Sequence, residues 1–449
     1  MNGKPMTEGT PWRYILRFAL PVLAGSLLQQ LYNTADTIIV GKFNGEDALS
    51  AVGTTTSLTF LFLAIAMGFS AGCGVIVAQH YGAKDEKLVK RSASTGILLL
   101  LGMGLVSTAV ALILSGPAYT YWIDVPEEIL DRTLVYFRIY ALGLLFQYGY
   151  NIFSSILRAV GDSAATLYFL LISSLSNIAL DLLFVAAFRW GVVGAALATD
   201  IAQAGSFVAA YIYMIKKYPM FRFGPRGFIW DTFLAKKTIT VGLPIALQMV
   251  VVSLGFSFIQ RAVNGFGKAM TASFTVGQRI EMYLNLPCNA FQTTLATYAG
   301  QNIGAGRPEN VRRGVRQTLV ISLAMSMVIS VAVWLFADAI IGLFGLGSQA
   351  MDYCRAHLRT VAFVNIIMGA YVPLFGVFQA SNHASVCTIV ASSVLSIRVL
   401  VTYLFRYSAF LGYAVIWWNG LFGFSIGFLI SWGYYLSGRW QKNATISAY

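Results

Sequence analysis

The sequence predicts an all-α integral membrane protein with twelve transmembrane helices in two pseudo-symmetric six-helix bundles. The first observation is composition. Of 449 residues, 57% are hydrophobic and only 11% are charged, whereas a soluble protein carries about a quarter charged residues. The second is that uncharged stretches such as 92–115 and 318–337 are long enough to cross a hydrocarbon core of about 30 Å. The third is an internal repeat.

The repeat relates two halves of the chain at a distance of about 222 positions. Residues 79–84 read Gln-His-Tyr-Gly-Ala-Lys, and residues 301–306 read Gln-Asn-Ile-Gly-Ala-Gly. In a chain solvated by lipid, such a repeat indicates a transporter whose halves enclose a shared path. Nearly the same offset aligns Leu20-Pro21 with Leu243-Pro244, residues 157–162 with 378–383, and Gly191 with Gly412.

Each expected helix is an apolar run bounded by polar residues. Six of these helices fall in an N-terminal lobe (1–217) and six in a C-terminal lobe (236–449). The basic connection 218–235 contains proline and glycine, so we interpret it as a cytoplasmic linker. Because six is even, both lobes enter the membrane from the same side, and we expect a two-fold axis along the membrane normal with a cavity between the lobes. The expected helices are 14–40, 48–79, 92–115, 131–157, 163–188, 191–216, 236–262, 270–300, 314–337, 353–379, 385–405 and 410–437.

Prolines fall within or near several of these runs. Each removes a backbone donor and strains the preceding turn, which lipid tolerates only where neighbouring helices or a wet cavity satisfy the freed carbonyl groups. We therefore expect interrupted helices at Pro21, Pro244, Pro287 and Pro373.

The net charge of +13 is gathered in alternate loops, which indicates membrane topology rather than nucleic-acid binding. Loops rich in lysine and arginine stay in the cytoplasm. We therefore expect an inner-membrane protein with both termini on the cytoplasmic side. The basic side chains are Lys84, Lys87, Lys90 and Arg91, then Lys216, Lys217, Arg222, Arg226, Lys236 and Lys237, then Arg307, Arg312, Arg313 and Arg316, with Arg13, Arg17, Arg439 and Lys442 near the termini.

Acidic residues inside predicted membrane helices indicate a functional or structural role, because a charged side chain at mid-bilayer costs about 2.5–3.5 kcal/mol. Asn177 and Asp181 are four residues apart and share one helix face. With Asp36 and Thr199 they supply oxygen ligands suited to a small hard cation such as sodium, or the two carboxylates share a proton. The structural alternative is that polar pairs merely join helices, each contributing about 1 kcal/mol or less.

Two further acids lie in predicted helices. Asp200 follows Thr199 and points about 100° away around the helix, so it faces a different environment and receives no role. Glu281 could attract a cationic solute, and we place it with Gln278 in a substrate-binding group. Alternatively Glu281 pairs with Arg279 or Arg398 in a structural bridge. His383 likewise receives no role.

An ordered set of motifs over residues 12–440 resembles the prokaryotic multidrug and toxic compound extrusion (MATE) transporters. The motifs are Leu31-Tyr32-Asn33-Thr34-Ala35-Asp36-Thr37 with Gly41, Gln79 with Gly82, Leu157-Arg158-Ala159-Val160-Gly161-Asp162, Asn177 with Asp181, and Gly194-Ala195-Ala196.

The resemblance implies a V-shaped pair of bundles around a central cavity that opens alternately to either side. It implies export of amphipathic, often cationic compounds in exchange for protons or sodium, with no cofactor. Coupling residues of the family match Asp36, Asn177, Asp181 and Thr199, and its proposed bending proline matches Pro21. Drug-contacting positions match Gln29, Tyr32 and Asn151.

Small amphipathic compounds and the lipid bilayer are the expected partners, and we expect a monomer that binds no nucleic acid. A lipid-linked oligosaccharide flippase of the same superfamily is the alternative, favoured only by Arg279 and Arg398, since an anionic lipid needs basic cavity walls. The sequence lacks the side-chain cluster of a membrane enzyme and the identical filter groups of a channel. Substrate, coupling ion and stoichiometry stay open.

Overall fold

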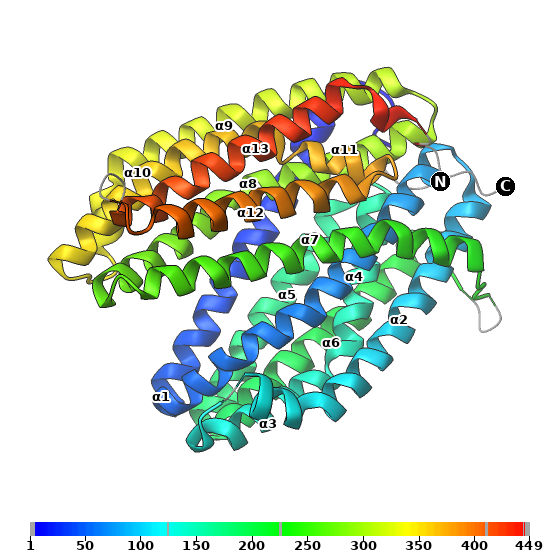
Figure 1. Cartoon of the computed structure of the whole chain (residues 1–449). Coiled ribbons are helices and arrows are strands. Elements are labelled where there is room, and N and C mark those ends of the chain that lie inside the picture. The colour runs from blue at the N-terminus through cyan, green and yellow to red at the C-terminus, as the bar shows by residue number, and fades with distance from the viewer. Residues whose placement is uncertain (1–4, 124, 224–226, 409–411, 443, 445–449) are drawn as a thin grey trace. The chain divides into compact units, whose positions relative to one another are not determined.

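The computed structural model describes residues 5–123, 125–223, 227–408, 412–442 and 444. These residues form thirteen α-helices joined by short turns, and no strand (Figure 1). The helices are α1 (Pro11–Gly82), α2 (Glu86–Pro117), α3 (Glu127–Leu142), α4 (Leu144–Ala159), α5 (Ser163–Asp181), α6 (Gly191–Lys217), α7 (Thr232–Asn264), α8 (Lys268–Gly304), α9 (Pro308–Gly342), α10 (Ser348–Tyr371), α11 (Leu374–Ala380), α12 (Ala384–Phe405) and α13 (Val415–Leu436).

These helices make the twelve expected spans, and ten spans of the described chain are long and apolar enough to cross a membrane by length and composition. The element α1 supplies the first two spans, because a kink at Gly45, with a φ of 81°, divides it into two helices. The single helix expected over 131–157 is instead broken at Gly143 into α3 and α4. No proline or charge marks that break in the sequence.

The backbone confirms the internal repeat. At the end of α1 the N–H of Asp85 donates to the carbonyl of His80 (3.2 Å), and at the end of α8 the N–H of Arg307 donates to that of Asn302 (2.8 Å). Residues with a positive φ recur at an offset of 221 or 222 positions. The pairs and their φ values are Gly45 (81°) and Gly267 (92°), Lys84 (60°) and Gly306 (67°), Gly161 (88°) and Asn382 (65°), and Gly191 (61°) and Gly412 (48°).

Contacts divide the chain into two compact units. The first contains Leu20–Ala246, and the second contains Met6–Ala19 together with the chain from Leu247 onward. The first core gathers side chains such as Phe137, Tyr148 and Phe153. The assignment of lobes to 1–217 and 236–449 stays a prediction. Residues 224–226 of the expected linker, including Arg226, and the terminal residues 1–4 and 445–449 lie outside the described residues.

Within the second unit, the segment that precedes the first span is fastened to the α8–α9 junction. The N–H of Met6 donates to Gln301 Oε1 at 2.7 Å. Arg307 Nη1 donates to the carbonyl of Thr7, also at 2.7 Å. These bonds fix the start of α1 on the second unit.

Within the first unit, the segment that precedes α7 is fastened to α2 in the same manner. The N–H of Asp231 donates to Thr95 Oγ1 at 3.1 Å, and Arg91 Nε lies 2.8 Å from Asp231 Oδ2. Helix α7 then crosses α1 so closely that a Cβ on Gly72 would lie 2.7 Å from the backbone of Gly242. Hydrogen bonds therefore hold the segment before α1 at the α8–α9 junction and the segment before α7 on α2.

The expected interruption by proline is found at one of four positions. Pro373 follows the end of α10 and precedes α11. The expectation is wrong for Pro21, Pro244 and Pro287, which lie inside the helices α1, α7 and α8. One missing N–H leaves a single carbonyl unsatisfied, and a membrane helix accommodates that loss through its neighbours.

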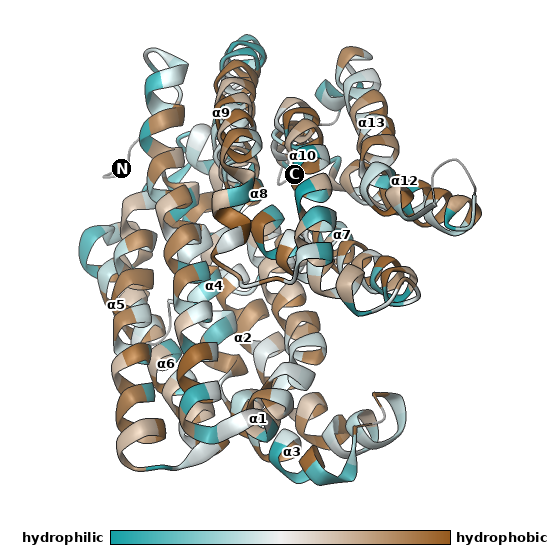
Figure 2. Ribbon diagram, turned by 90° about the vertical axis from the view of Figure 1, so that its left-hand side faces the viewer, coloured by the Kyte–Doolittle hydropathy of each residue, from teal (hydrophilic) through white to brown (hydrophobic). Residues whose placement is uncertain are grey.

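Large hydrophobic side chains cover the outer faces of the helices. On α5 the exposed stripe is Tyr168, Ile172 and Leu175, spaced for one helix face. On α9 it includes Val320, Met327 and Val331. Figure 2 shows hydrophobic colouring along much of both helices. Apolar surface of this extent is stable only against lipid or another apolar partner.

A buried carboxylate joins the start of α5 to the end of α6. Asp162 Oδ2 accepts hydrogen bonds from Tyr218 (2.7 Å), Lys217 (2.8 Å) and Tyr213 (2.9 Å). Burial by itself would raise the pKa of Asp162, but the hydrogen bonds from Lys217, Tyr218 and Tyr213 outweigh it and hold the pKa below its usual value. His383, the repeat counterpart of Asp162, precedes α12, and its ring centroid lies 6.0 Å from that of Tyr434.

The Asp162 network predicts a pH-dependent stability. Because the folded pKa is lowered, the contribution of Asp162 is fully present above its unfolded pKa and is lost as the pH falls through the folded pKa. We expect Asp162→Asn to lower the free energy of unfolding by about 1–3 kcal/mol near neutral pH, since charge-assisted hydrogen bonds disappear. Melting curves of the purified protein from about pH 6 to about pH 3 should show a smaller acid loss in the variant.

The control is Asp47→Asn, which removes an exposed ion pair of 3.3 Å with Arg132 and should change stability by about 0.5 kcal/mol or less. An acid response of Asp162→Asn equal to that of the native chain would contradict the assignment.

Candidate functional site

Two carboxyl groups meet inside the first unit. Asp36 lies in α1 and Asp181 is the last residue of α5, yet their side chains lie within hydrogen-bonding reach of each other. Asp181 is 0% exposed. Oδ1 of each carboxyl group is buried without a hydrogen-bond partner. Two carboxylates at this spacing repel each other, so the pair favours binding of a proton or a cation.

The polypeptide immediately after Asp181 departs from α-helical geometry. Residues Leu182–Ala187 form a π-helical segment, and such segments are frequent at functional sites because they shift the register of side chains and carbonyls. The π-helical segment thus begins directly after Asp181, the second carboxylate of the pair.

Asn177 and Thr199 complete a connected polar group with Asp181. In the amide orientation that satisfies both neighbours, Asn177 Nδ2 donates to Asp181 Oδ2 at 3.0 Å, and Asn177 Oδ1 accepts from the N–H of Thr199 at 3.2 Å. The hydroxyl of Thr199 donates to the carbonyl of Ala195 at 3.1 Å. The structure therefore brings together three helices, α1, α5 and α6, at all four residues of the expected ion site.

Tyrosines enclose this polar group. The phenol groups of Tyr32 and Tyr136 both lie in the electrostatic field of Asp36 and Asp181. Tyr136 also stacks on Tyr140 with ring centroids 6.5 Å apart, and Tyr140 exchanges hydrogen bonds with Gln147. Tyrosine offers both a hydroxyl donor and an aromatic face that attracts cations. Of these residues, only Tyr32 was predicted from the sequence to belong to the site.

The other expected substrate residues of the first unit are less closely connected. Gln29 is exposed on α1, one turn before Tyr32. Asn151 on α4 donates to the carbonyl of Gln147 on its own helix at 2.8 Å. Among the described hydrogen bonds and ion pairs, none joins either residue to the carboxyl pair. Pro21 lies in α1 fifteen residues before Asp36, at the point where the helix passes from one compact unit to the other.

Asp200 has a structural partner. Its carboxylate accepts a hydrogen bond from the backbone of Gly143, at the break between α3 and α4. A Cβ on Gly143 would lie 2.0 Å from Asp200 Oδ1, so only glycine allows this approach. The N–H of Gly143 also donates to the carbonyl of Tyr140 at 3.1 Å, so Asp200 adds a second acceptor at the helix break. No described hydrogen bond joins Asp200 to the Asp36–Asp181 group.

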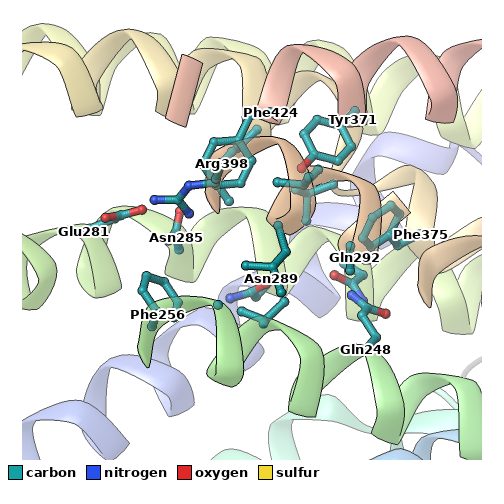
Figure 3. Close-up of a pocket in the computed structure, with 17 residues that line it drawn as sticks. Gln248, Phe256, Glu281, Asn285, Asn289, Gln292, Tyr371, Phe375, Arg398 and Phe424 are labelled. Carbon is teal, nitrogen blue, oxygen red and sulfur yellow. The ribbon is translucent and has the colours of Figure 1, made fainter. Parts of the chain in front are cut away.

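The second unit contains a cavity of about 200 Å³ that Glu281 lines. Arg398, which the sequence offered as a partner for Glu281, lines the same cavity, whereas Arg279 is exposed and does not (Figure 3). Gln278 is half-buried one turn away on α8 and is not part of the lining.

Most of the residues that line this cavity were not predicted from the sequence. On α8 the lining includes Asn285, Asn289 and Gln292, which follow Glu281 at intervals of four, eight and eleven residues and so share its face. This carboxamide spacing was visible in the sequence. Tyr136 and Tyr140 were also visible as a four-residue pair, but only the fold shows that Tyr136 faces Asp36.

Comparisons with known proteins agree over the full length. The family model MatE matches residues 21–183 and 244–404, one segment in each half of the repeat. The chain is 29% identical over 447 residues to "Probable multidrug resistance protein YpnP" of Bacillus subtilis (strain 168), covering 98% of each chain. It is 24% identical to "Probable multidrug resistance protein YoeA" of the same strain, covering 94% of this chain and 93% of that protein.

A solved structure of a multidrug resistance MATE family transporter in an outward-facing conformation has the same fold, with a TM-score of 0.91 and 24% identity over 97% of this chain and 98% of that chain. The two-segment family match and the full-length relatives account for the repeat, the twelve spans and the apolar outer surface together. The chain therefore belongs to the MatE family of multidrug efflux transporters, multi-pass membrane proteins that move small organic compounds.

Proposed function

We propose that the chain is a cation-coupled antiporter that exports amphipathic, mainly cationic drugs or toxic organic compounds by alternating access. The observation that carries this proposal is the buried Asp36–Asp181 pair, whose carboxyl groups lie within hydrogen-bonding reach beside Asn177 and Thr199. Its oxygen-rich surroundings suit sodium, and its two adjacent carboxylates suit a shared proton.

Exchange follows from competition for the same negative charge. A proton or sodium ion that binds the pair neutralises it and weakens the attraction for a cationic substrate. When the ion leaves, the charge returns and favours the substrate. Such reciprocal coupling is required thermodynamically when each ligand lowers the affinity for the other.

The driving force sets what each exchange can achieve. One charge that crosses 100 mV releases about 2.3 kcal/mol, and one pH unit adds about 1.4 kcal/mol. Together these support a gradient of roughly a few hundred-fold for an uncharged compound. One-for-one exchange of a monovalent cation for a proton cancels the electrical contribution and leaves about tenfold per pH unit.

We assign the hinge to Pro21 and the substrate contacts to Gln29, Tyr32, Asn151, Gln278 and Glu281. Support for the hinge is that α1 passes between the compact units at Ala19–Leu20, and that a missing N–H weakens the helix there. Support for Tyr32 is its place beside the carboxyl pair.

We place the chain in the inner membrane as a monomer, with lobes 1–217 and 236–449 on either side of the substrate path. The linker 218–235 and both termini lie in the cytoplasm, since lysine and arginine gather in these segments. The family match favours efflux of small organic compounds over oligosaccharide flipping.

The test is ethidium export from proteoliposomes under an imposed pH gradient or an imposed sodium gradient. We expect one of the two gradients to drive export and its collapse by an ionophore to abolish it. Pro21→Ala restores the helix donor and should slow export in the same vesicles while leaving the protein folded. Absence of export under both gradients would contradict the proposed antiport, and unchanged rates in Pro21→Ala would contradict the hinge.

A further inference from the structure

The cavity of the second unit is lined by one acidic residue, Glu281, and one basic residue, Arg398. Its lining comes from α7, α8, α10 to α11, α12 and α13. Glu281 and Arg398 lie at one end of it, and Phe256, Phe424 and Tyr371 supply aromatic surface. A buried volume with two opposite charges, carboxamides and rings has the mixed chemistry of a ligand site.

Glu281 is a buried carboxylate that interacts with Arg398 only through its electrostatic field. It is only 7% exposed, yet among the described residues it makes no hydrogen bond and no ion pair, either with Arg398 or with the neighbouring Arg279. Figure 3 shows its carboxylate pointing toward the Arg398 guanidinium within the cavity. A buried charge left in this way is costly, which indicates that a group from outside completes the site.

The side chain of Arg398 is held in place by its neighbours, and it lines the same cavity. Its Nε donates to Asn419 Oδ1 at 2.9 Å, and Asn419 is itself fixed by donating to the carbonyl of Ile416 at 2.7 Å. The guanidinium carbon lies 5.0 Å from the Phe424 ring centroid and 5.8 Å from that of Phe256. No described hydrogen bond uses Nη1 or Nη2, so these paired donors are free to receive a carboxylate in a bidentate manner.

The rest of the cavity wall is polar along one helix face. Asn285, Asn289 and Gln292 line it from α8, and Gln248 lines it from α7. Gln248 Oε1 is buried without a hydrogen-bond partner. The wall therefore offers donors and acceptors for a polar substituent next to the two charges.

We propose that this cavity binds a small aromatic zwitterion, whose ammonium group faces Glu281 and whose carboxylate is held by Nη1 and Nη2 of Arg398. The ring of the ligand lies among Phe256, Phe424 and Tyr371. This inference rests on the proposed export function, for which it names a second substrate class at a site separate from the Asp36–Asp181 pair.

Charge balance selects the zwitterion. A compound with only a positive charge meets the repulsion of Arg398, and one with only a negative charge meets that of Glu281. Like-charge contacts of this kind cost several kcal/mol at a desolvated site. The volume of about 200 Å³ is below the roughly 300–1,000 Å³ of pockets for drug-sized ligands. The occupant is therefore a molecule with one ring, of the size of a single amino acid.

The test is equilibrium dialysis of the purified full-length protein in detergent against three matched probes. Phenylalanine is zwitterionic, phenylalanine amide is a cation, and 3-phenylpropionate is an anion of the same shape. We expect phenylalanine to bind at least about tenfold more tightly than either singly charged probe.

Variants identify the charges responsible. Arg398→Gln should lose the preference for phenylalanine and bind the amide as well as or better than the zwitterion. Glu281→Gln should show the opposite change, toward 3-phenylpropionate. The matched control Arg279→Gln removes an exposed arginine two residues from Glu281 and should leave all three affinities unchanged.

Equal binding of the three probes to the native protein, or no binding of any, would overturn the proposal, as would Arg398→Gln with native preferences. If the glutamine variants do not fold, Arg398→Lys retains the charge without the planar fork and should keep the order of the probes with weaker binding. The dialysis uses no gradient and no dye, so its failure leaves ion-driven ethidium export intact. Loss of export in the vesicles leaves the dialysis result equally unaffected.

Discussion

Asp181→Asn is expected to reduce gradient-driven ethidium export by at least about tenfold, and Asp36→Asn by a similar factor. Each substitution removes one of two carboxyl groups that lie within hydrogen-bonding reach, and a single remaining carboxylate binds a proton or sodium without the second ligand. The loss of even about 1.4 kcal/mol of differential ion binding corresponds to a factor of ten. Initial export rates in proteoliposomes at matched protein density measure the effect.

The matched control is Asp200→Asn, which replaces a third acidic residue in the same unit. Asp200 accepts a hydrogen bond from the backbone of Gly143, and the asparagine carbonyl can accept it as well. Export by this variant should stay within about twofold of the native rate. An equal loss in Asp200→Asn and Asp181→Asn would show that the carboxyl pair has no special role.

The double variant of Asp36→Asn and Asp181→Asn tests whether the two carboxyl groups act together. In the proposed mechanism Asp36 and Asp181 bind the same ion, so removal of both should cost little more than removal of either one. Residues in direct contact show such non-additive effects, whereas independent sites add within about 0.5 kcal/mol. Additive losses would mean that the two carboxylates serve separate steps.

Gly376→Ala is expected to cause the largest loss of stability among single methyl additions in the second unit. Its Cβ would lie 2.2 Å from the carbonyl oxygen of Gln292 and 2.7 Å from the N of Ala296. Both atoms belong to the backbone of α8, so no side chain can rotate away and α11 must move. We expect a loss of about 3 kcal/mol and a melting temperature several degrees lower in detergent.

Gly433→Ala is the control for that substitution. Gly433 lies in α13 with nothing within 4 Å of an added Cβ, and alanine favours the helix by up to about 1 kcal/mol. Its melting temperature should be unchanged or slightly higher. A native-like melting temperature for Gly376→Ala would mean that α11 and α8 do not pack at the distance described.

Much of the fold could be predicted from the sequence because the relevant signals are local or periodic. Apolar runs predicted the spans, and the repeat of Gln79–Lys84 at Gln301–Gly306 predicted two related halves, which the paired residues with positive φ confirm. The break at Gly143 could not be predicted, because the acceptor that allows it, Asp200, lies far along the chain in α6. Helices α1 and α7 also continue through Pro21 and Pro244, because neighbouring helices decide whether a missing donor ends a span.

Hydropathy and the repeat are enough to predict a membrane protein with two related sets of six spans, and to place Asp36 and Asp181 as acids in apolar surroundings. The folded structure is needed to show that these two acids lie within hydrogen-bonding reach, that Asp200 contacts the break at Gly143, and that Arg398, not Arg279, lines the cavity with Glu281. Hydropathy and residue spacing report only on side chains in neighbouring turns of one helix. The rotation of each helix about its axis is set by packing against helices distant in the chain, and that rotation decides which side chains meet.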